Sequence, residues 1–190
     1  MQDAVPVGDG AMAALIGIDL GQAEQIAAEA ARGEVCVAAN DNAPGQIVLS
    51  GASEAVERAV RISKEKGAKR SMLLSVSAPF HCPLMAPAAE TMSRALGEIK
   101  PRSPTVPIIS NVTAKPEKNP KEIQRLLVEQ ITSRVRWRQS IENMIDLGVN
   151  TFVEIGVGKV LTGMNRRIDK RVQGISIQTA NDIEEFLKTL

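Results

Sequence analysis

The order of local patterns in residues 8–77 constrains the fold of this chain most. An apolar run, "AMAALIGI", is typical of a buried strand, and Asp19 follows it at a position suited to cap a helix. The next stretch, "LGQAEQIAAEAARG", is rich in helix formers and ends at Gly33, a common helix stop. Two strand patterns, "EVCVAAN" and "QIVLSG", flank the turn residues "DNAPG". A second helix pattern then ends at Gly67, and "AKRSMLLSVS" predicts a fourth strand.

Strand, helix, strand, strand, helix, strand is the order of the split βαβ, or ferredoxin-like, arrangement. Such a unit buries one face of a four-stranded sheet under two helices. We therefore predict a complete small domain over residues 8–77. Residues 1–7 have a different character, because they read as the end of a helix that runs into a Pro/Gly turn.

The pattern of elements predicted over residues 78–190 is that of an α/β layer. Helix patterns alternate with strand patterns such as "VNTFVEIG" and "KRVQGISIQ", which favours parallel pairing. Only about three strands are found there, too few for a complete doubly wound domain. The sequence thus predicts one small domain followed by part of a larger one.

Composition excludes several classes of function. The net charge is +1 and aromatic residues make up 2%, so neither a basic field nor a base-stacking platform for nucleic acid is indicated. No apolar run approaches the roughly 18 residues of a membrane span. The two cysteines form no paired framework, which favours a reducing compartment and predicts a cytoplasmic protein.

His81, the single histidine, is the first candidate for chemistry. It lies in "SVSAPFHCPLMAPAAE", after a predicted strand end, where catalytic groups of α/β proteins gather. An imidazole there suits a general base or acid, although a loop histidine without a role is the alternative. One His and two distant Cys give no ligand cluster, so we predict no metal. Cys82 is predicted to be a small apolar filler, because neighbours in sequence point apart.

A histidine base requires a nucleophile, and the serines of this chain do not offer one. None of the twelve lies in the G-x-S-x-G motif of a nucleophile elbow. The glycines of "EIGVGKVLTGM", residues 154–164, suggest either a phosphate site at a helix N-terminus or, more simply, a tight turn. The Asn-rich stretch at 39–46 is explained by ordinary turn chemistry.

Several segments together resemble the malonyl-CoA:acyl carrier protein transacylase family. They are "MQDAVPVGDGAMAALIGID", "ANDNAPGQIVLSG", "SAPFHCPLMAPAAE", "PTVPIISNVTA", "VEQITSRVRWRQSIENMIDLGV" and "EIGVGKVLTGMNRRI". The resemblance runs through the whole chain in order. It implies an acyltransferase of fatty acid biosynthesis that moves malonyl from coenzyme A to the phosphopantetheine thiol of acyl carrier protein by a Ser/His mechanism. It implies no cofactor, since the coenzyme A thioester is the substrate, and it favours a monomer.

The resemblance also assigns roles to five residues. His81 matches the catalytic histidine, and Gln130 matches the glutamine whose backbone carbonyl holds that histidine in the required tautomer. Asn40 resembles an asparagine of the acyl pocket. Phe80 stands where related domains carry a Phe that favours malonyl, and Met1 matches an internal methionine that we include among the substrate-binding residues.

Three parts of the family pattern are missing from these 190 residues: a G-Q-G segment, the G-H-S-L-G elbow and the Arg that grips the malonyl carboxylate. The resemblance therefore covers about the C-terminal 60% of such an enzyme. It implies a tail of a large-domain helix at 1–7, the ferredoxin-like domain at 8–77, and the C-terminal part of an α/β-hydrolase-like domain at 78–190. We expect this chain alone to be inactive.

Two further interpretations remain open. One is a non-catalytic module that docks acyl carrier protein through the basic segments "RISKEKGAKR" and "NRRIDKR", since such a carrier is acidic. Solvated helix faces explain those charges as well. The other is a fragment without a function of its own.

Overall fold

The computed structural model describes residues 1–189 and divides the chain into two compact units, Met1–Ser140 and Ile141–Leu190. The boundary lies within helix α5, Trp137–Asp146. The domain boundary expected at residue 77 stays a prediction.

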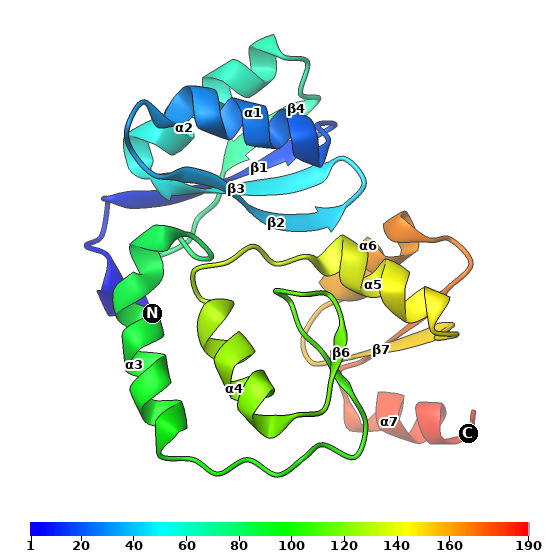
Figure 1. The fold of residues 1–190 in the computed structure, drawn as a ribbon. Helices are drawn as coiled ribbons and strands as arrows, with labels where there is room; N and C mark the ends of the chain where they lie inside the picture. The colour runs from blue at the N-terminus through cyan, green and yellow to red at the C-terminus, as the bar shows by residue number, and fades with distance from the viewer. Residues whose placement is uncertain (190) are drawn as a thin grey trace. The chain divides into compact units, whose positions relative to one another are not determined.

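A four-stranded antiparallel sheet with two helices forms the beginning of the first unit. Its elements are β1 (Gly10–Ile16), α1 (Leu20–Ala31), β2 (Cys36–Ala43), β3 (Gln46–Ala52), α2 (Ser53–Glu65) and β4 (Arg70–Leu73). The strands lie in the order β2-β3-β1-β4, and every neighbouring pair is antiparallel. This is the order of elements that the local patterns predict. In Figure 1, α1 and α2 lie together on one face of this sheet.

The period of two along each strand divides the sheet into two faces. Ala13 and Leu15 of β1 point to the face that α1 and α2 cover, where they join the main apolar core. Met12, on the alternate face, packs with Ala39 and Val48. The helix-free face is therefore also apolar, and it is this face that the segment around His81 covers.

Helix α1 begins as predicted. The Asp19 carboxylate accepts from the backbone N–H of Gln22 at 2.8 Å, and the Gln22 side chain accepts from the Asp19 N–H at 3.2 Å. Two of the backbone donors that a helix start leaves open are satisfied in this reciprocal way.

The hairpin of β2 and β3 differs from the prediction. The stretch 41–45 was expected to be a turn, but β2 continues to Ala43 and leaves only Pro44 and Gly45 between the strands. Irregular register between Ala38 and Asn40, and again between Asp41 and Ala43, accommodates the extra residues. Asp and Asn favour turns locally, but β2 has a second neighbour beyond β3, and tertiary pairing overrides the local preference.

The rest of the first unit places two helices side by side. Short 3-10 helices span Gln2–Ala4 and Pro83–Met85, followed by α3 (Ala86–Gly97), β5 (Ile108–Ile109), β6 (Pro116–Glu117) and α4 (Pro120–Glu129). Helices α3 and α4 pack together (Figure 1). The Gln124 side chain ties them, because its Nε2 donates to the carbonyls of Leu96 and Ile99 at 2.7 and 2.9 Å. The short strands β5 and β6 pair antiparallel, with Ile108 opposite Glu117.

The second unit is a small α/β layer. Strand β7 (Thr151–Ile155) pairs in parallel with β8 (Gln173–Ile177), which confirms the predicted parallel pairing. Helix α6 (Val160–Ile168) connects them, and α7 (Ala180–Leu187) follows. A Cβ added at Gly174 would lie 2.5 Å from Thr162 Cγ2, so the strand and α6 approach closely, and a larger residue here would displace the Thr162 side chain. Among residues 1–189, no helix has the length and apolarity to cross a membrane.

Candidate active site

His81 lies in a loop that is packed tightly against β1. Its backbone φ is 60°, a left-handed conformation that few residues other than glycine adopt, although histidine is among the more tolerant. Pro79, two residues earlier, is fully buried, and a Cβ added at Gly10 would lie 2.3 Å from the Pro79 ring. The strained conformation of His81 is therefore fixed by the packing of its neighbours, as is common at functional sites.

Gln130 and His81 meet across 49 residues of sequence. The His81 Nδ1 lies 2.8 Å from the backbone carbonyl oxygen of Gln130. That carbonyl lies at the C-terminal cap of α4, among the last carbonyls that a helix leaves without an internal partner. A carbonyl only accepts hydrogen bonds, so Nδ1 carries the proton, and the Nε2 of the neutral ring is left as an acceptor.

The segment that leaves α4 is clamped to β2. Val135 exchanges two backbone hydrogen bonds with β2, donating to the Ala39 carbonyl at 2.8 Å and accepting from the Asp41 N–H at 2.9 Å. Arg134 Nε donates to the Ala38 carbonyl at 2.7 Å. Arg138 grips the carboxylate of Asp41, which is 4% exposed, with its closest N–O distance at 2.8 Å. These contacts fix where the end of α4 lies.

Asn40 and Phe80 lie close to the same clamp. Asn40 forms a parallel bridge with Val135 at the irregular part of β2. Phe80, directly before His81, is half-buried and packs on the helix-free face of the sheet with Met12, Ala39 and Val48. Phe80 also contacts a second apolar cluster that includes Ile131, the residue after Gln130. The structure thus brings Phe80, Asn40, His81 and Gln130 into one region of the first unit.

Met1 lies in a different setting. It lines a pocket of about 350 Å³ along α3, together with Ala4, Thr91, Met92 and Ile131 among others. Its side chain is half exposed. Ile131 is the residue that connects this pocket to the end of α4.

The cysteines are buried and behave as apolar residues. Burial raises the pKa of the Cys36 thiol to about 11 and also raises the pKa of the Cys82 thiol. Cys82 Sγ donates to the Pro79 carbonyl at 3.1 Å, which supports the loop of His81. A buried thiol with a raised pKa is a poor nucleophile. Within residues 1–189, no group of three or more His, Cys, Asp or Glu residues is arranged to hold a metal ion.

The glycine turn before α6 is occupied by a side chain of the chain itself. The Glu154 carboxylate accepts from the backbone N–H of Leu161 and Thr162 at 3.1 and 2.8 Å, and from the Thr162 hydroxyl at 2.7 Å. These bonds lower the pKa of Glu154. Gly158 N–H donates to the Gln178 side chain at 2.9 Å. Of the two interpretations of this turn, the structural one is supported, because a carboxylate already fills the position that a phosphate would take.

The basic segments are partly neutralised by ion pairs. Lys66 pairs with Glu29 at 2.6 Å, and Arg171 pairs with Asp169 at 2.6 Å. The segment 61–70 lies in the first unit and 165–171 in the second.

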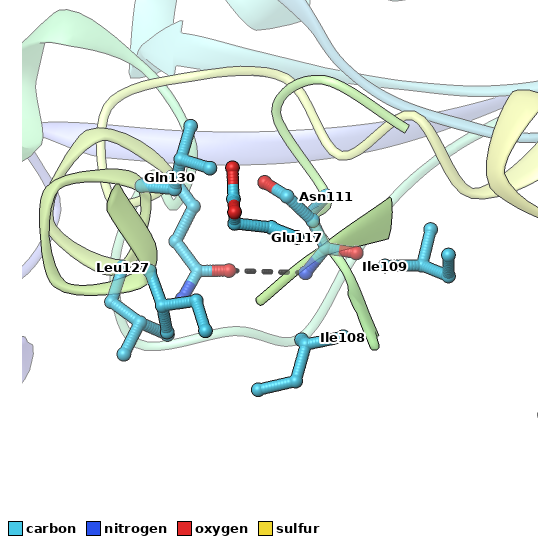
Figure 2. Close-up of a pocket in the computed structure, with 9 residues that line it drawn as sticks. Ile108, Ile109, Asn111, Glu117, Leu127 and Gln130 are labelled. Atoms are coloured by element: carbon cyan, nitrogen blue, oxygen red, sulfur yellow. Dashed lines mark hydrogen bonds between the residues drawn. The ribbon is translucent and has the colours of Figure 1, made fainter. Parts of the chain in front are cut away.

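A small apolar pocket lies behind the Gln130 side chain, and no pattern in the sequence predicts it. Its volume is about 140 Å³, and Figure 2 shows the side chains around it. The lining residues are Ile108, Ile109, Ser110, Asn111, Glu117, Ile123, Leu126, Leu127 and Gln130. At its wall the Asn111 side-chain N–H donates to Gln130 Oε1 at 3.0 Å, drawn as the dashed line. The only sequence signal near Asn111 is the turn-forming composition of "SNVTA", which points to no particular partner.

Comparison with known proteins shows the family of this chain. The profile of the acyl transferase domain matches residues 1–180. This chain belongs to the acyl transferase domain family. The malonyl CoA-acyl carrier protein transacylase of Haemophilus influenzae is 46% identical over 190 residues, which are 98% of this chain and 61% of that protein.

Two solved structures share the fold. The acyl-carrier-protein S-malonyltransferase of Bartonella henselae matches with a TM-score of 0.95 at 52% identity, over 99% of this chain and 60% of that one. A malonyl-transacylase in complex with its type II PKS acyl-carrier protein matches with a TM-score of 0.96 at 38% identity, over 100% of this chain and 61% of that one. The chain thus spans about 60% of the length of these relatives, and its mixed α/β fold is theirs.

Proposed function

We propose that this chain is the part of a malonyl-CoA:acyl carrier protein transacylase that supplies the catalytic base, His81. The observation that supports this proposal most directly is the 2.8 Å contact between His81 Nδ1 and the Gln130 carbonyl, in a chain of the acyl transferase domain family. The contact leaves Nε2 as the acceptor for a proton, which is the state that a general base requires.

In this proposal the nucleophile is a serine hydroxyl supplied from outside residues 1–190. His81 Nε2 takes the hydroxyl proton as the oxygen attacks the thioester carbonyl of malonyl-CoA. When the tetrahedral intermediate collapses, the C–S bond breaks, and the imidazolium returns the proton to the departing thiolate of coenzyme A. The phosphopantetheine thiol of acyl carrier protein then attacks the malonyl-serine ester, and His81 acts once more as base and acid.

Gln130 has the orienting role in this scheme. The polar, uncharged carbonyl holds the Nδ1 proton and partly compensates the imidazolium charge, a task that a carboxylate performs in other triads. Its place at a helix C-terminus suits this role, because the negative end of the helix dipole favours a cation.

Asn40, Phe80 and Met1 are proposed to shape the acyl site. Phe80 is held by apolar contacts on two sides, so a side chain next to the base is fixed in place, which suits discrimination by size. Asn40 lies on the strand to which the end of α4 is clamped. Met1 lines the separate pocket along α3, where it would contact a more distant part of the substrate.

The finer division of the fold is proposed with the function. We propose that residues 8–77 are a ferredoxin-like domain and that 78–190 are the C-terminal part of an α/β-hydrolase-like domain, with 1–7 as the tail of a large-domain helix. The sheet order β2-β3-β1-β4 and the parallel pair β7-β8 support this division. We propose acyl carrier protein as the partner, a monomeric state and a cytoplasmic location.

A transfer assay tests the proposal. The 190-residue chain, and the same residues joined in frame to their upstream coding sequence, are each incubated with radiolabelled malonyl-CoA and holo-acyl carrier protein. We expect a labelled carrier and an acid-stable acyl-enzyme only with the longer protein, if the upstream sequence supplies the serine. Transfer by the 190-residue chain at the rate of the longer protein would contradict the Ser/His assignment. Binding of the carrier without transfer by the longer protein would favour the docking-module interpretation.

A further inference from the structure

The Gln130 residue is held at two points, and the second point concerns its side chain. Its backbone N–H donates to the Leu126 carbonyl at 3.0 Å as the last turn of α4 closes. Its side-chain Oε1 accepts from Asn111 Nδ2 at 3.0 Å (Figure 2). The backbone carbonyl of the same residue is the one that faces His81 Nδ1. The orientation of that carbonyl therefore depends on both anchors.

Asn111 is itself fixed by the turn between β5 and β6. Its carbonyl accepts from the Arg136 backbone N–H at 3.0 Å. The next residue, Val112, donates its N–H to the Ser110 hydroxyl at 3.2 Å. Ala114 donates to the Ser110 carbonyl at 2.8 Å and has a φ of 57°, which closes a tight turn. These bonds hold the Asn111 side-chain donor in place, and the bond between its own carbonyl and Arg136 ties it to the segment that is clamped to β2.

The apolar surroundings of the Asn111–Gln130 hydrogen bond increase its energetic contribution. Apolar side chains of Ile123, Leu126 and Leu127 line the pocket beside the two amides. In such a setting a hydrogen bond is stronger than in water, and a lost partner is harder to replace. A Gln130 side chain released from Asn111 would turn toward solvent, and the peptide that carries the carbonyl would gain freedom.

We propose that Asn111 is a positioning residue for His81, acting through Gln130. The side-chain bond holds the Gln130 peptide so that its carbonyl keeps the proton of His81 on Nδ1 and leaves Nε2 free to accept. The catalytic consequence rests on the function proposed above. The effect on the tautomer of His81 does not, because it follows from the hydrogen bonds alone.

The test is the tautomer of His81, read by long-range ¹H–¹⁵N correlation spectra of protein labelled at histidine, above the pH at which the ring is charged. Signals are assigned with His81→Asn. Wild type is expected to show a protonated Nδ1. In Asn111→Ala we expect the ratio of the Nδ1–H to the Nε2–H tautomer to fall about fivefold, the effect of losing one neutral hydrogen bond.

Four further variants make the interpretation of the tautomer ratio specific. Gln130→Met keeps the side-chain length but removes the acceptor, so it should give the same shift, and the double variant should add nothing. Asn111→Asp should keep a wild-type tautomer, because the Gln130 amide can rotate and donate to the carboxylate. Asn119→Ala is the matched control. Asn119 caps the other end of α4 by accepting from Lys121 N–H at 3.0 Å, so its loss should lower stability without changing His81.

The outcomes separate a positioning role from a merely structural one. An unchanged tautomer in Asn111→Ala, or a wild-type ring protonated on Nε2, would overturn the inference. If Asn111→Ala fails to fold, Gln130→Met answers the same question from the other end of the bond.

An assay of malonyl transfer by the longer protein tests the catalytic consequence separately. We expect kcat in Asn111→Ala to fall about three- to tenfold with KM for malonyl-CoA unchanged, as suits one lost hydrogen bond that acts on the base. If the protein transfers no malonyl but the tautomer responds as predicted, the proposed function fails and the positioning role of Asn111 stands. If transfer is normal but the tautomer does not respond, the positioning role fails and the proposed function stands.

Discussion

The C-terminus of α4 and the N-terminus of α6 handle their open backbone groups in opposite ways. The start of α6 is satisfied by Glu154, seven and eight residues before the amides that it accepts from. At the end of α4, the Gln130 carbonyl accepts a hydrogen bond from His81, 49 residues away in sequence. The open amides of α6 are bonded by a residue close in sequence, whereas the open carbonyl of α4 is bonded by a residue that only the tertiary fold brings near.

This difference teaches which helix end is available for chemistry. A helix terminus that a neighbouring side chain already caps contributes stability and offers nothing to a ligand. A terminus that orients a titratable ring from a distant loop has a part in the proposed function, and its position must be held by contacts elsewhere. Such contacts are found at Arg134, Val135 and Arg138, which clamp the segment after α4 to β2.

The largest predicted effect is on catalysis, from His81→Asn. Asparagine tolerates the left-handed backbone at this position, so the fold should persist, but no proton acceptor remains. Malonyl transfer by the longer protein should fall about 10²- to 10⁴-fold, the range for loss of a general base. Single-turnover transfer and thermal unfolding, measured on the same sample, check this. Retention of more than half of the rate would mean that His81 is not the base.

Arg138→Met is predicted to have the next largest effect, because it tests whether the end of α4 depends on its clamp. It leaves the Asp41 carboxylate, 4% exposed, without its bidentate partner. Because Arg138 itself is 31% exposed, we expect a loss of about 2 kcal/mol in the free energy of unfolding, less than for a fully buried pair. Urea unfolding measures it. Asp41→Asn combined with Arg138→Met should recover part of the loss, and no recovery would show that the charge pair is not its cause.

Glu154→Gln tests the locally completed helix end. The amide side chain is a weaker acceptor for the N–H groups of Leu161 and Thr162, so stability should fall by about 1 kcal/mol, as for a weakened helix cap. The rate of malonyl transfer well below the unfolding midpoint should not change, in contrast with His81→Asn. A strong loss of rate at full stability would contradict the structural role given to this end.

The smallest effect is the pH dependence of the same cap. Hydrogen bonds to Thr162 lower the pKa of Glu154 in the folded protein, so the carboxylate stabilises the fold above its ordinary pKa of about 4.3. That contribution is lost as the pH falls from this value through the lower folded pKa. The difference in unfolding free energy between wild type and Glu154→Gln should be constant from pH 7 to about pH 5.5 and shrink below about pH 4. A gap that widens on acidification would have the wrong sign for this account.

The fold of residues 8–77 was largely predictable because its signals are local. Apolar alternation, the cap at Asp19 and the stop at Gly33 act within a few residues, and the structure has the elements in the predicted order. The prediction failed at 41–43, where Asp41 and Asn42 favour a turn but β2 stays paired with β3 as far as Ala43, opposite Gln46. The distant Val135 backbone pairs with the same strand at Ala39 and Asp41, and this second contact is not contained in any local window of sequence.

By itself, the sequence predicted the chemical type of the site, from a single histidine after a predicted strand, and a resemblance added Gln130 as its partner. The tertiary structure alone decided the 2.8 Å contact between them, the filling of the α6 turn by Glu154 instead of a phosphate, and the bond from Asn111 to Gln130. The physical reason is the separation in sequence over which each interaction acts. Periodicity and capping act between near neighbours, whereas the orientation of the His81 ring depends on hydrogen bonds that form only when distant segments are packed together.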